Sequence, residues 1–109
     1  MKRGDVVLVV AQGDLGKPRP GVVVQSNELP DTTTTVLICP MSSDVDSTAQ
    51  IRPVVEPSTS NGLRARSQIM TDKVLPLRRD RVRRMLGSLK ANEIERLDRA
   101  LLIVLGLAR

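Results

Sequence analysis

Apolar residues along the chain fall into short runs separated by polar segments that contain glycine or proline. Runs of about four to eight residues with many β-branched side chains are typical of buried strands. Because a proline cannot donate a ladder hydrogen bond, Pro53 places the weaker fourth run at a sheet edge or a bulge, and Pro40 is expected to end the third. The pattern predicts extended segments at residues 6–10, 21–26, 34–39, 51–56, 65–77 and 83–89.

One amphipathic helix is predicted at the end of the chain. Its apolar positions are three, four and three residues apart, which places them on one helical face, and they are Ile94, Leu97, Leu101 and Val104. Asn92 is the expected N-cap, with Glu95 in the capping-box position three residues later. Gly106 is expected to end the helix.

Several short strands followed by one helix predict a mainly β fold, a small barrel-like sheet with a C-terminal α-helix. No internal repeat and no long linker divides the sequence, so we expect a single domain over residues 1–109. Signals for helix-turn-helix, Rossmann, P-loop and zinc-finger modules are missing. No apolar run has transmembrane length, and the N-terminal residues do not resemble a signal peptide.

Composition excludes several kinds of chemistry. The sequence contains no Phe, Trp or Tyr, so RNA recognition by aromatic stacking is excluded and the core must consist of Val, Leu, Ile and Met. It also contains no His, which excludes imidazole acid–base catalysis and His-ligated metal sites. We expect neither a metal nor another cofactor.

The single cysteine, Cys39, lies inside an apolar run and is expected to be a small buried hydrophobic residue rather than a nucleophile. One cysteine forms no intrachain disulfide, which suits a reducing cytoplasm.

Charge is distributed unevenly. The formal net charge is +5, with net −2 in residues 1–63 and net +7 in residues 64–109. A basic half indicates a polyanion or an acidic partner protein, although a solvated arginine-rich surface explains charge alone equally well. The densest basic cluster consists of Arg78, Arg79, Arg81, Arg83 and Arg84.

Four segments resemble motifs of one known family and occur in the family's order along almost the whole chain. The motifs are an RGD before a hydrophobic strand, an RP before a V-V strand, a strand end with proline and two hydroxyl residues, and a DQIRT-like element ending in DK. The matching segments are residues 3–9, 17–26, 37–43 and 67–73, and residues 87–89 and 101–107 look like the family's G-x-L element and its terminal helix ending in LGL. The chain thereby resembles the MazF/PemK toxins, with Leu8 in place of the usual tryptophan and Ser67 in place of the usual aspartate.

The resemblance implies an SH3-like or CcdB-like β-barrel that forms a homodimer and is neutralised by a cognate acidic antitoxin. It implies a metal-independent endoribonuclease, an mRNA interferase that cleaves single-stranded RNA at selected sequences. The products would carry a 2′,3′-cyclic phosphate and a 5′-hydroxyl, and the toxin would inhibit translation.

Arg19 matches the family's most characteristic arginine, and Ser42 matches its strand-end hydroxyl residue. These two are the expected catalytic residues. The resemblance implies an acid–base role for the arginine, but we favour charge stabilisation because a guanidinium rarely releases its proton. The flanking prolines, Pro18 and Pro20, restrict the backbone around Arg19. Without the resemblance, a turn arginine and a turn serine explain both positions.

Further residues are expected to contact RNA, together with the loops at residues 12–17 and 27–33, which also overlap the expected antitoxin path. These residues are Lys17, Gln25, Ser43, Arg64, Arg66 and Gln68. Because Ser67 and Ala65 replace the aspartate and arginine of the PemK branch, a PemK-style relay is disfavoured. Asp72 is expected to be a structural partner of a nearby arginine.

Two readings without nuclease activity stay open at this point. A CcdB-like toxin that binds DNA gyrase has the same fold, and it would place function on the C-terminal helix. A non-catalytic SH3-like binding domain is the other alternative, which the departures at Leu8 and Ser67 permit. The retained Arg19 and the pair Ser42 and Ser43 favour the nuclease.

Overall fold

A computed structural model of the chain describes residues 1–11, 13, 15–46 and 50–108. It contains seven strands, two short 3-10 helices and one α-helix in the described residues. In chain order they are β1 (Asp5–Val9), β2 (Arg19–Val23), β3 (Thr35–Ser42), β4 (Val54–Val55), β5 (Ser67–Ile69), η1 (Thr71–Lys73), β6 (Leu75–Arg78), η2 (Arg79–Arg81), β7 (Val82–Ser88) and α1 (Ala91–Val104).

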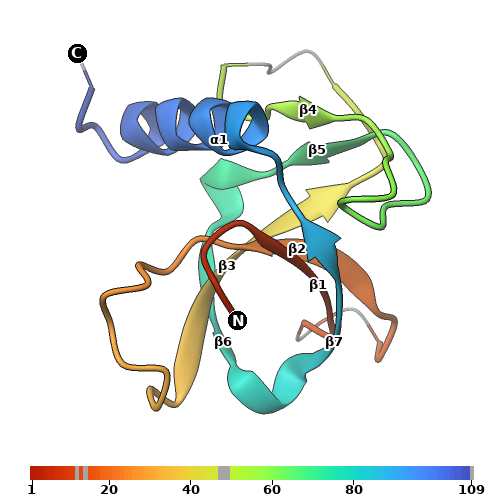
Figure 1. Cartoon of the computed structure of the whole chain (residues 1–109), viewed down its shortest axis with the longest axis vertical. Coiled ribbons are helices and arrows are strands. Elements are labelled where there is room, and N and C mark those ends of the chain that lie inside the picture. Colours follow the sequence, from red (N-terminus) through yellow and green to blue (C-terminus); the bar gives the residue numbers. More distant parts are fainter. Residues whose placement is uncertain (12, 14, 47–49, 109) are drawn as a thin grey trace.

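The strands form one strongly curled antiparallel sheet. Its order is β4-β5-β3-β2-β1-β7, and β6 pairs with β3 outside this path. Figure 1 shows β1, β2, β3, β6 and β7 curling around a central space, while α1 lies beside β4 and β5. The predicted mainly β fold, a small barrel-like sheet with a C-terminal helix, is confirmed.

Strand β3 continues through Pro40 to Ser42, so the prediction that Pro40 ends it is wrong. β6 pairs with β3 only as far as Ile38, whereas β5 pairs with it from Met41 onward. Pro40 falls between these two neighbours, where its missing N–H breaks no ladder bond. Its carbonyl is used, since it accepts a hydrogen bond of 2.9 Å from the Met70 N–H.

The other predicted strands are found with shifted ends. β2 begins at Arg19, two residues before the predicted start, and β4 keeps only two residues of the predicted run. The Pro53 carbonyl extends that edge by accepting the Ile69 N–H at 2.9 Å. The predicted extended segment at residues 65–77 contains β5 and the start of β6, but η1 interrupts it.

The core consists of two clusters on the two faces of the curled sheet. One lies between the sheet and α1 and includes Val6, Val22, Met41, Ile69 and Leu97. The second fills the inside of the curl and consists of Val7, Val9, Val23, Val36, Ile38 and Leu77. Strand residues therefore alternate between a face that the helix covers and a face inside the curl.

Helix α1 buries the predicted face, because Leu97 and Leu101 are both buried. Its N-cap, however, is Lys90 and not Asn92. The Glu93 carboxylate accepts the Lys90 backbone N–H at 2.8 Å, so Glu93 closes the capping box in place of Glu95. Glu95 instead pairs with Arg99 one turn later. No helix in the described residues is long and apolar enough to cross a membrane.

The corrected cap predicts that substitutions of Glu93 and Glu95, both near the start of the helix, change stability by different amounts. Glu93→Ala removes the acceptor of the Lys90 N–H and should lower the free energy of unfolding by about 1 kcal/mol. Glu95→Ala removes only an exposed pair on the helix surface and should cost at most about 0.5 kcal/mol. Urea denaturation of both variants measures this, and a larger loss in Glu95→Ala would contradict the assignment.

Candidate active site

A pocket of about 420 Å³ opens where the ends of β1, β2 and β3 meet η1 and β6. Its floor is apolar, and its charged side chains among the described residues are both basic, Arg19 and Lys73. The pocket is lined by Val9, Ala11, Arg19, Ile38, Pro40, Met41, Ser42, Met70, Lys73, Leu75 and Leu77. The structure thus brings together the two expected catalytic residues, Arg19 and Ser42.

The register between β2 and β3 explains why these two residues share a pocket. Gly21 is the partner of Pro40 in the antiparallel ladder, so two residues further along Arg19 comes to the level of Ser42. Residues two apart in a strand point to the same face. A Cβ atom on Gly21 would lie 2.7 Å from Cγ2 of Ile38, so glycine is needed for this close approach.

Each side chain starts from a fixed backbone. Arg19 is the partner of Val9 in β1, and the prolines on both sides hold their own φ near the extended range. Ser42 is the partner of Gln68 in β5. The Ser42 Oγ accepts the Asp44 N–H at 3.1 Å, which closes a turn directly after the strand.

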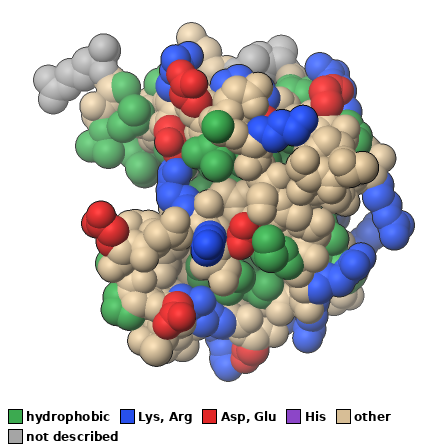
Figure 2. Space-filling view, in the orientation of Figure 1, with side chains coloured by type: hydrophobic (Ala, Val, Ile, Leu, Met, Phe, Trp, Pro, Cys, Tyr) green, Lys and Arg blue, Asp and Glu red, His purple; other side chains and the backbone are tan. Residues whose placement is uncertain are grey.

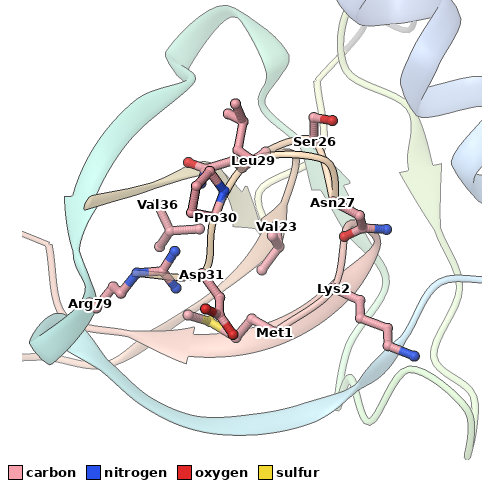
Figure 3. A pocket seen from close by; sticks show the side chains of 11 residues that line it. Met1, Lys2, Val23, Ser26, Asn27, Leu29, Pro30, Asp31, Val36 and Arg79 are labelled. Atoms are coloured by element: carbon pink, nitrogen blue, oxygen red, sulfur yellow. The ribbon is translucent and has the colours of Figure 1, made fainter. Parts of the chain in front are cut away.

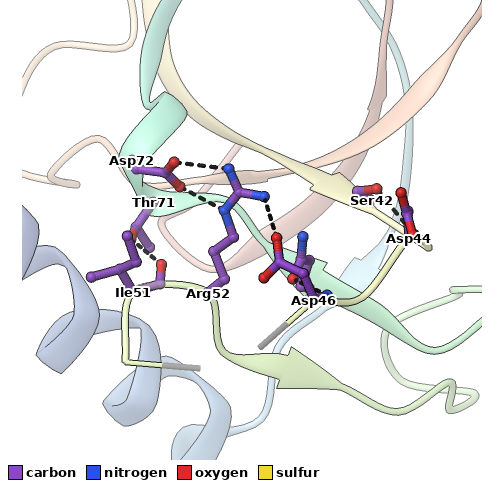
Figure 4. A network of polar contacts seen from close by, with 8 residues as sticks. Ser42, Asp44, Asp46, Ile51, Arg52, Thr71 and Asp72 are labelled. Atoms are coloured by element: carbon purple, nitrogen blue, oxygen red, sulfur yellow. Dashed lines mark hydrogen bonds and ion pairs between the residues drawn. The ribbon is translucent and has the colours of Figure 1, made fainter. Parts of the chain in front are cut away.

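A polar network lies beside Ser42, and Arg52 is at its centre (Figure 4). The Arg52 guanidinium donates to both carboxylate oxygens of Asp72, at 2.9 and 2.8 Å, and it also contacts Asp46 at 3.4 Å. The prediction that Asp72 is a structural partner of an arginine is confirmed. Hydrogen bonding to Arg52 lowers the pKa of Asp72 and raises the pKa of Arg52.

Lys73 ends η1 and lines the pocket, although the sequence reasoning gave it no role. The Thr71 hydroxyl donates to the Ile51 carbonyl, and the Met70 N–H donates to the Pro40 carbonyl, so η1 is tied to the segment before β4 and to β3. The available signal was the DK at the end of the fourth motif, five residues after Gln68. Arg52 had no sequence signal beyond the expectation of a partner for Asp72.

The expected RNA contact by Gln68 needs correction, because its side chain is only 1% exposed. Its carbonyl oxygen accepts the Asp46 N–H at 3.2 Å. The Gln68 amide therefore faces the inside of the chain and supports the loop that follows Ser42. The neighbouring Ser67 is also buried, and its hydroxyl donates to the Ala65 carbonyl at 2.9 Å.

Gln25 and the loop at residues 27–33 border a different pocket, of about 570 Å³, that contains neither Arg19 nor Ser42. Figure 3 shows its lining side chains around the opening of the curl, among them Lys2, Asn27, Asp31 and Arg79. Gln25 uses its own amide inside the chain: its oxygen accepts the Leu37 N–H at 3.1 Å, and its nitrogen donates to Thr33 at 3.3 Å. In the loop expected to border the RNA groove, Gln12 and Asp14 lie outside the described residues.

The remaining expected RNA contacts are on the surface but not in the pocket. Lys17 and Ser43 are exposed and adjoin the strand ends that carry Arg19 and Ser42. Arg64 and Arg66 are exposed before β5, and Arg66 pairs with Glu56 at 2.8 Å.

The arginines around η2 form a basic patch, defined here as Arg78, Arg81, Arg83 and Arg84, all exposed. Figure 2 shows basic side chains along the margin where η2 and β7 lie. Arg78 pairs with Asp80 at 2.7 Å. Arg79 is less exposed and donates to the Thr33 carbonyl and hydroxyl, so it fixes a loop rather than extending the patch.

Cys39 is fully buried in the cluster beneath α1, which confirms the prediction for this residue. Burial raises the pKa of its thiol to about 12. Within the described part of the chain, no group of three His, Cys, Asp or Glu residues lies together as a metal site.

Fold and pocket together define a class: a small curled β-sheet protein with one C-terminal helix, whose strand ends present basic groups and a hydroxyl in one pocket. The model of the family of PemK-like, MazF-like toxins of type II toxin–antitoxin systems matches residues 2–105. The chain is also 35% identical over 109 residues to a probable endoribonuclease MazF of Mycolicibacterium smegmatis, with 99% of each protein covered. The chain therefore belongs to the PemK-like, MazF-like toxin family.

Solved structures agree on the fold. The Mycobacterium tuberculosis toxin MazF-mt6 superposes with a TM-score of 0.81 at 20% identity, covering 96% of this chain and 99% of that one. A mycobacterial endoribonuclease in complex with its cognate antitoxin superposes with a TM-score of 0.82 at 20% identity, covering 100% and 98%. A Deinococcus radiodurans MazE–MazF structure gives 0.77 at 17% identity, covering 99% and 98%.

The lowered pKa of Asp72 predicts a pH-dependent contribution to stability. A carboxyl whose folded pKa is depressed stabilises the fold above its unfolded pKa and loses that contribution as pH falls through its folded pKa. At pH 7, Asp72→Asn should therefore be less stable than the wild type, by at most about 1 kcal/mol because the pair is partly exposed. The difference should shrink below about pH 4 and vanish at lower pH.

Thermal unfolding from pH 7 down to pH 2 measures this difference. Asp31→Asn, at an exposed carboxyl of the other pocket, is the control and should follow the wild type more closely. A constant difference between Asp72→Asn and the wild type across the whole pH range would contradict the prediction.

Burial of Cys39 predicts an unreactive thiol in the folded protein. Because the thiolate is the reactive form and its pKa is raised to about 12, a thiol reagent at pH 8 should not modify the native chain. The same reagent should modify the chain completely in denaturant. Mass spectrometry after timed exposure measures this, and rapid modification of the native protein would contradict the burial.

Proposed function

We propose that this chain is the toxin of a type II toxin–antitoxin module and acts as an endoribonuclease on single-stranded RNA, thereby inhibiting translation. The reaction is an internal transfer in which the ribose 2′-oxygen attacks the adjacent phosphorus and expels the 5′-oxygen. It leaves a 2′,3′-cyclic phosphate and a 5′-hydroxyl. The observation that carries the proposal is the shared pocket of Arg19 and Ser42.

Arg19 is the group suited to the developing charge. A guanidinium donates two parallel hydrogen bonds to two oxygens of one phosphate, which stabilises the pentavalent phosphorus. Preorganised donors of this kind lower the barrier most where water is displaced. The strand pairing of Arg19 with Val9 fixes the backbone from which its exposed side chain reaches the pocket, and apolar side chains line much of that pocket.

Ser42 is suited to donate a hydrogen bond to a phosphoryl oxygen. Its Oγ already accepts the Asp44 N–H at 3.1 Å. A hydroxyl has one proton to donate and two lone pairs, so this bond occupies a lone pair and leaves the proton for the substrate. We therefore propose that Ser42 binds the scissile phosphate.

RNA flanking the reacting phosphate is proposed to follow the exposed basic groups. Lys17 and Ser43 adjoin the pocket, and Arg64 and Arg66 lie on the loop before β5. The basic patch around η2 can bind further phosphates or the acidic tail of an antitoxin. Gln68 is left out of this surface because it is buried.

Catalysis is proposed to need no metal ion or other cofactor. The sequence offers no histidine, and the described carboxylates and thiol do not gather into a ligand set. A mycobacterial endoribonuclease of the same fold is in complex with its cognate antitoxin, so we propose an acidic antitoxin as partner. Membership of the toxin family leads us to propose a homodimer as the active form and the cytoplasm as location. A single toxin domain would occupy residues 1–109.

The first test follows the products of a mixed-sequence RNA incubated with the purified chain and a chelator. We expect cleavage at a short recurrent sequence, with cyclic-phosphate and 5′-hydroxyl ends identified by mass spectrometry. Arg19→Ala should lower the cleavage rate by about 100- to 1,000-fold because a preorganised donor is lost. Ser42→Ala should also lose activity.

Arg99→Ala is the matched control, because Arg99 is an exposed helix arginine paired with Glu95. It removes the same charge and should cleave like the wild type. Intact RNA together with stalled gyrase would overturn the proposal in favour of a CcdB-like toxin. Full activity in Ser42→Ala would remove Ser42 from the mechanism but leave Arg19 in it.

A further inference from the structure

We propose that Lys73 is the general acid of this site and protonates the departing 5′-oxygen. The inference rests on the proposed ribonuclease activity and assigns one further catalytic residue to it. Its basis is the position of Lys73 in the same pocket as Arg19 and Ser42.

The reaction requires a proton donor that the other two residues supply poorly. The 5′-oxygen leaves as an alkoxide, which is a poor leaving group unless it is protonated. A guanidinium keeps its proton in proteins, and the serine proton is held by an alcohol oxygen. Among the described side chains that line the pocket, Lys73 is therefore the residue whose type serves as a general acid in proteins.

The position of Lys73 is fixed by its surroundings. The Lys73 N–H donates to the Met70 carbonyl at 3.0 Å, and the Met70 N–H donates to Pro40 of β3 at 2.9 Å. The hydroxyl of Thr71 donates to the Ile51 carbonyl. The short helix η1 is thus tied to the strand that ends at Ser42, so the backbone of Lys73 has a fixed position at the edge of the pocket.

The ammonium group of Lys73 is also available to a substrate. The adjacent carboxylate, Asp72, has both oxygens engaged by Arg52, at 2.9 and 2.8 Å (Figure 4). In the part of the chain that the structure describes, no ion pair involves Lys73. Lys73 is exposed, so its flexible four-carbon stem can bring the ammonium group to a bound phosphodiester.

The proposed step balances without a further reactant. The bond between the 2′-oxygen and phosphorus forms as the 2′-hydroxyl proton passes to water. The bond between phosphorus and the 5′-oxygen breaks, and its electron pair goes to that oxygen. The 5′-oxygen takes a proton from the Lys73 ammonium, and the neutral amine then regains a proton from water.

The test uses two short RNAs that contain the mapped cleavage sequence and a single cleavable linkage. One is an ordinary RNA, and the other has sulfur in place of the scissile 5′-oxygen. A thiolate leaves without protonation, so the second substrate does not need a general acid. Single-turnover rates are measured on both substrates for the wild type and for Lys73→Ala, Lys73→Arg, Arg19→Ala and Lys90→Ala.

We expect Lys73→Ala to cleave the ordinary RNA at least about 100-fold more slowly than the wild type, the range typical of a lost general acid. It should cleave the sulfur substrate at close to the wild-type rate. Lys73→Arg keeps the positive charge, but a guanidinium does not release its proton to the leaving oxygen. This variant should therefore behave like Lys73→Ala. Arg19→Ala should be slow on both substrates. Lys90→Ala removes an exposed lysine at the start of α1 and should match the wild type.

An equal loss of Lys73→Ala on both substrates would overturn the assignment, because it would show binding, charge stabilisation or misfolding rather than proton transfer. Wild-type activity in either Lys73 variant on the ordinary RNA would overturn it as well. In these cases the ribonuclease proposal would stand as long as Arg19→Ala is inactive. Failure of the wild type to cut either RNA would instead refute the proposed function itself.

Discussion

The close approach of β2 to β3 at Gly21 is the contact on which the site depends. A Cβ atom there would lie 2.7 Å from Cγ2 of Ile38 and 3.4 Å from the Cys39 carbonyl oxygen. A side chain at this position would have to displace that Ile38 methyl group, which packs inside the curl beside the Gly21–Pro40 pair that sets the register of β2 on β3. Arg19 and Ser42 reach the same pocket through the register of β2 on β3. The core packing inside the curl and the placement of the two side chains therefore depend on the same strand pairing.

Much of the fold follows from local pattern, and the exceptions have physical causes. The β-branched runs and the helical face were predicted because burial repeats with the period of each element. Pro40 resembles a strand end in the sequence because the sequence does not show where β3 exchanges β6 for β5 as its neighbour. At that point a missing N–H breaks no ladder bond. The helix cap moved to Lys90 because Glu93, not Glu95, reaches back to its N–H.

The site was less accessible to sequence reasoning than the fold. Arg19 and Ser42 came from resemblance, since a turn arginine and a turn serine look alike in any sequence. The predicted RNA contact of Gln68 is wrong because the side chain is buried when β5 pairs with both β3 and β4, and a sequence does not show these pairings. Lys73 belongs to the fourth motif, but the motif does not predict a role for it. Only the tertiary contact of η1 with β3 brings Lys73 to the pocket.

The acidic residues near the pocket show how the chain keeps that pocket positive. Asp46 and Asp72 stand close to the phosphate's proposed place, and an unpaired carboxylate there would repel the substrate. Arg52 does not line the pocket, and it pairs with both carboxylates, so its single positive charge offsets one of their two negative charges without occupying the site. Asp44, by contrast, contributes its backbone N–H to Ser42. The charge at the site therefore depends on which side chains the fold brings there, Arg19 and Lys73 in the pocket and Arg52 beside its acidic neighbours, as well as on the net charge of the chain.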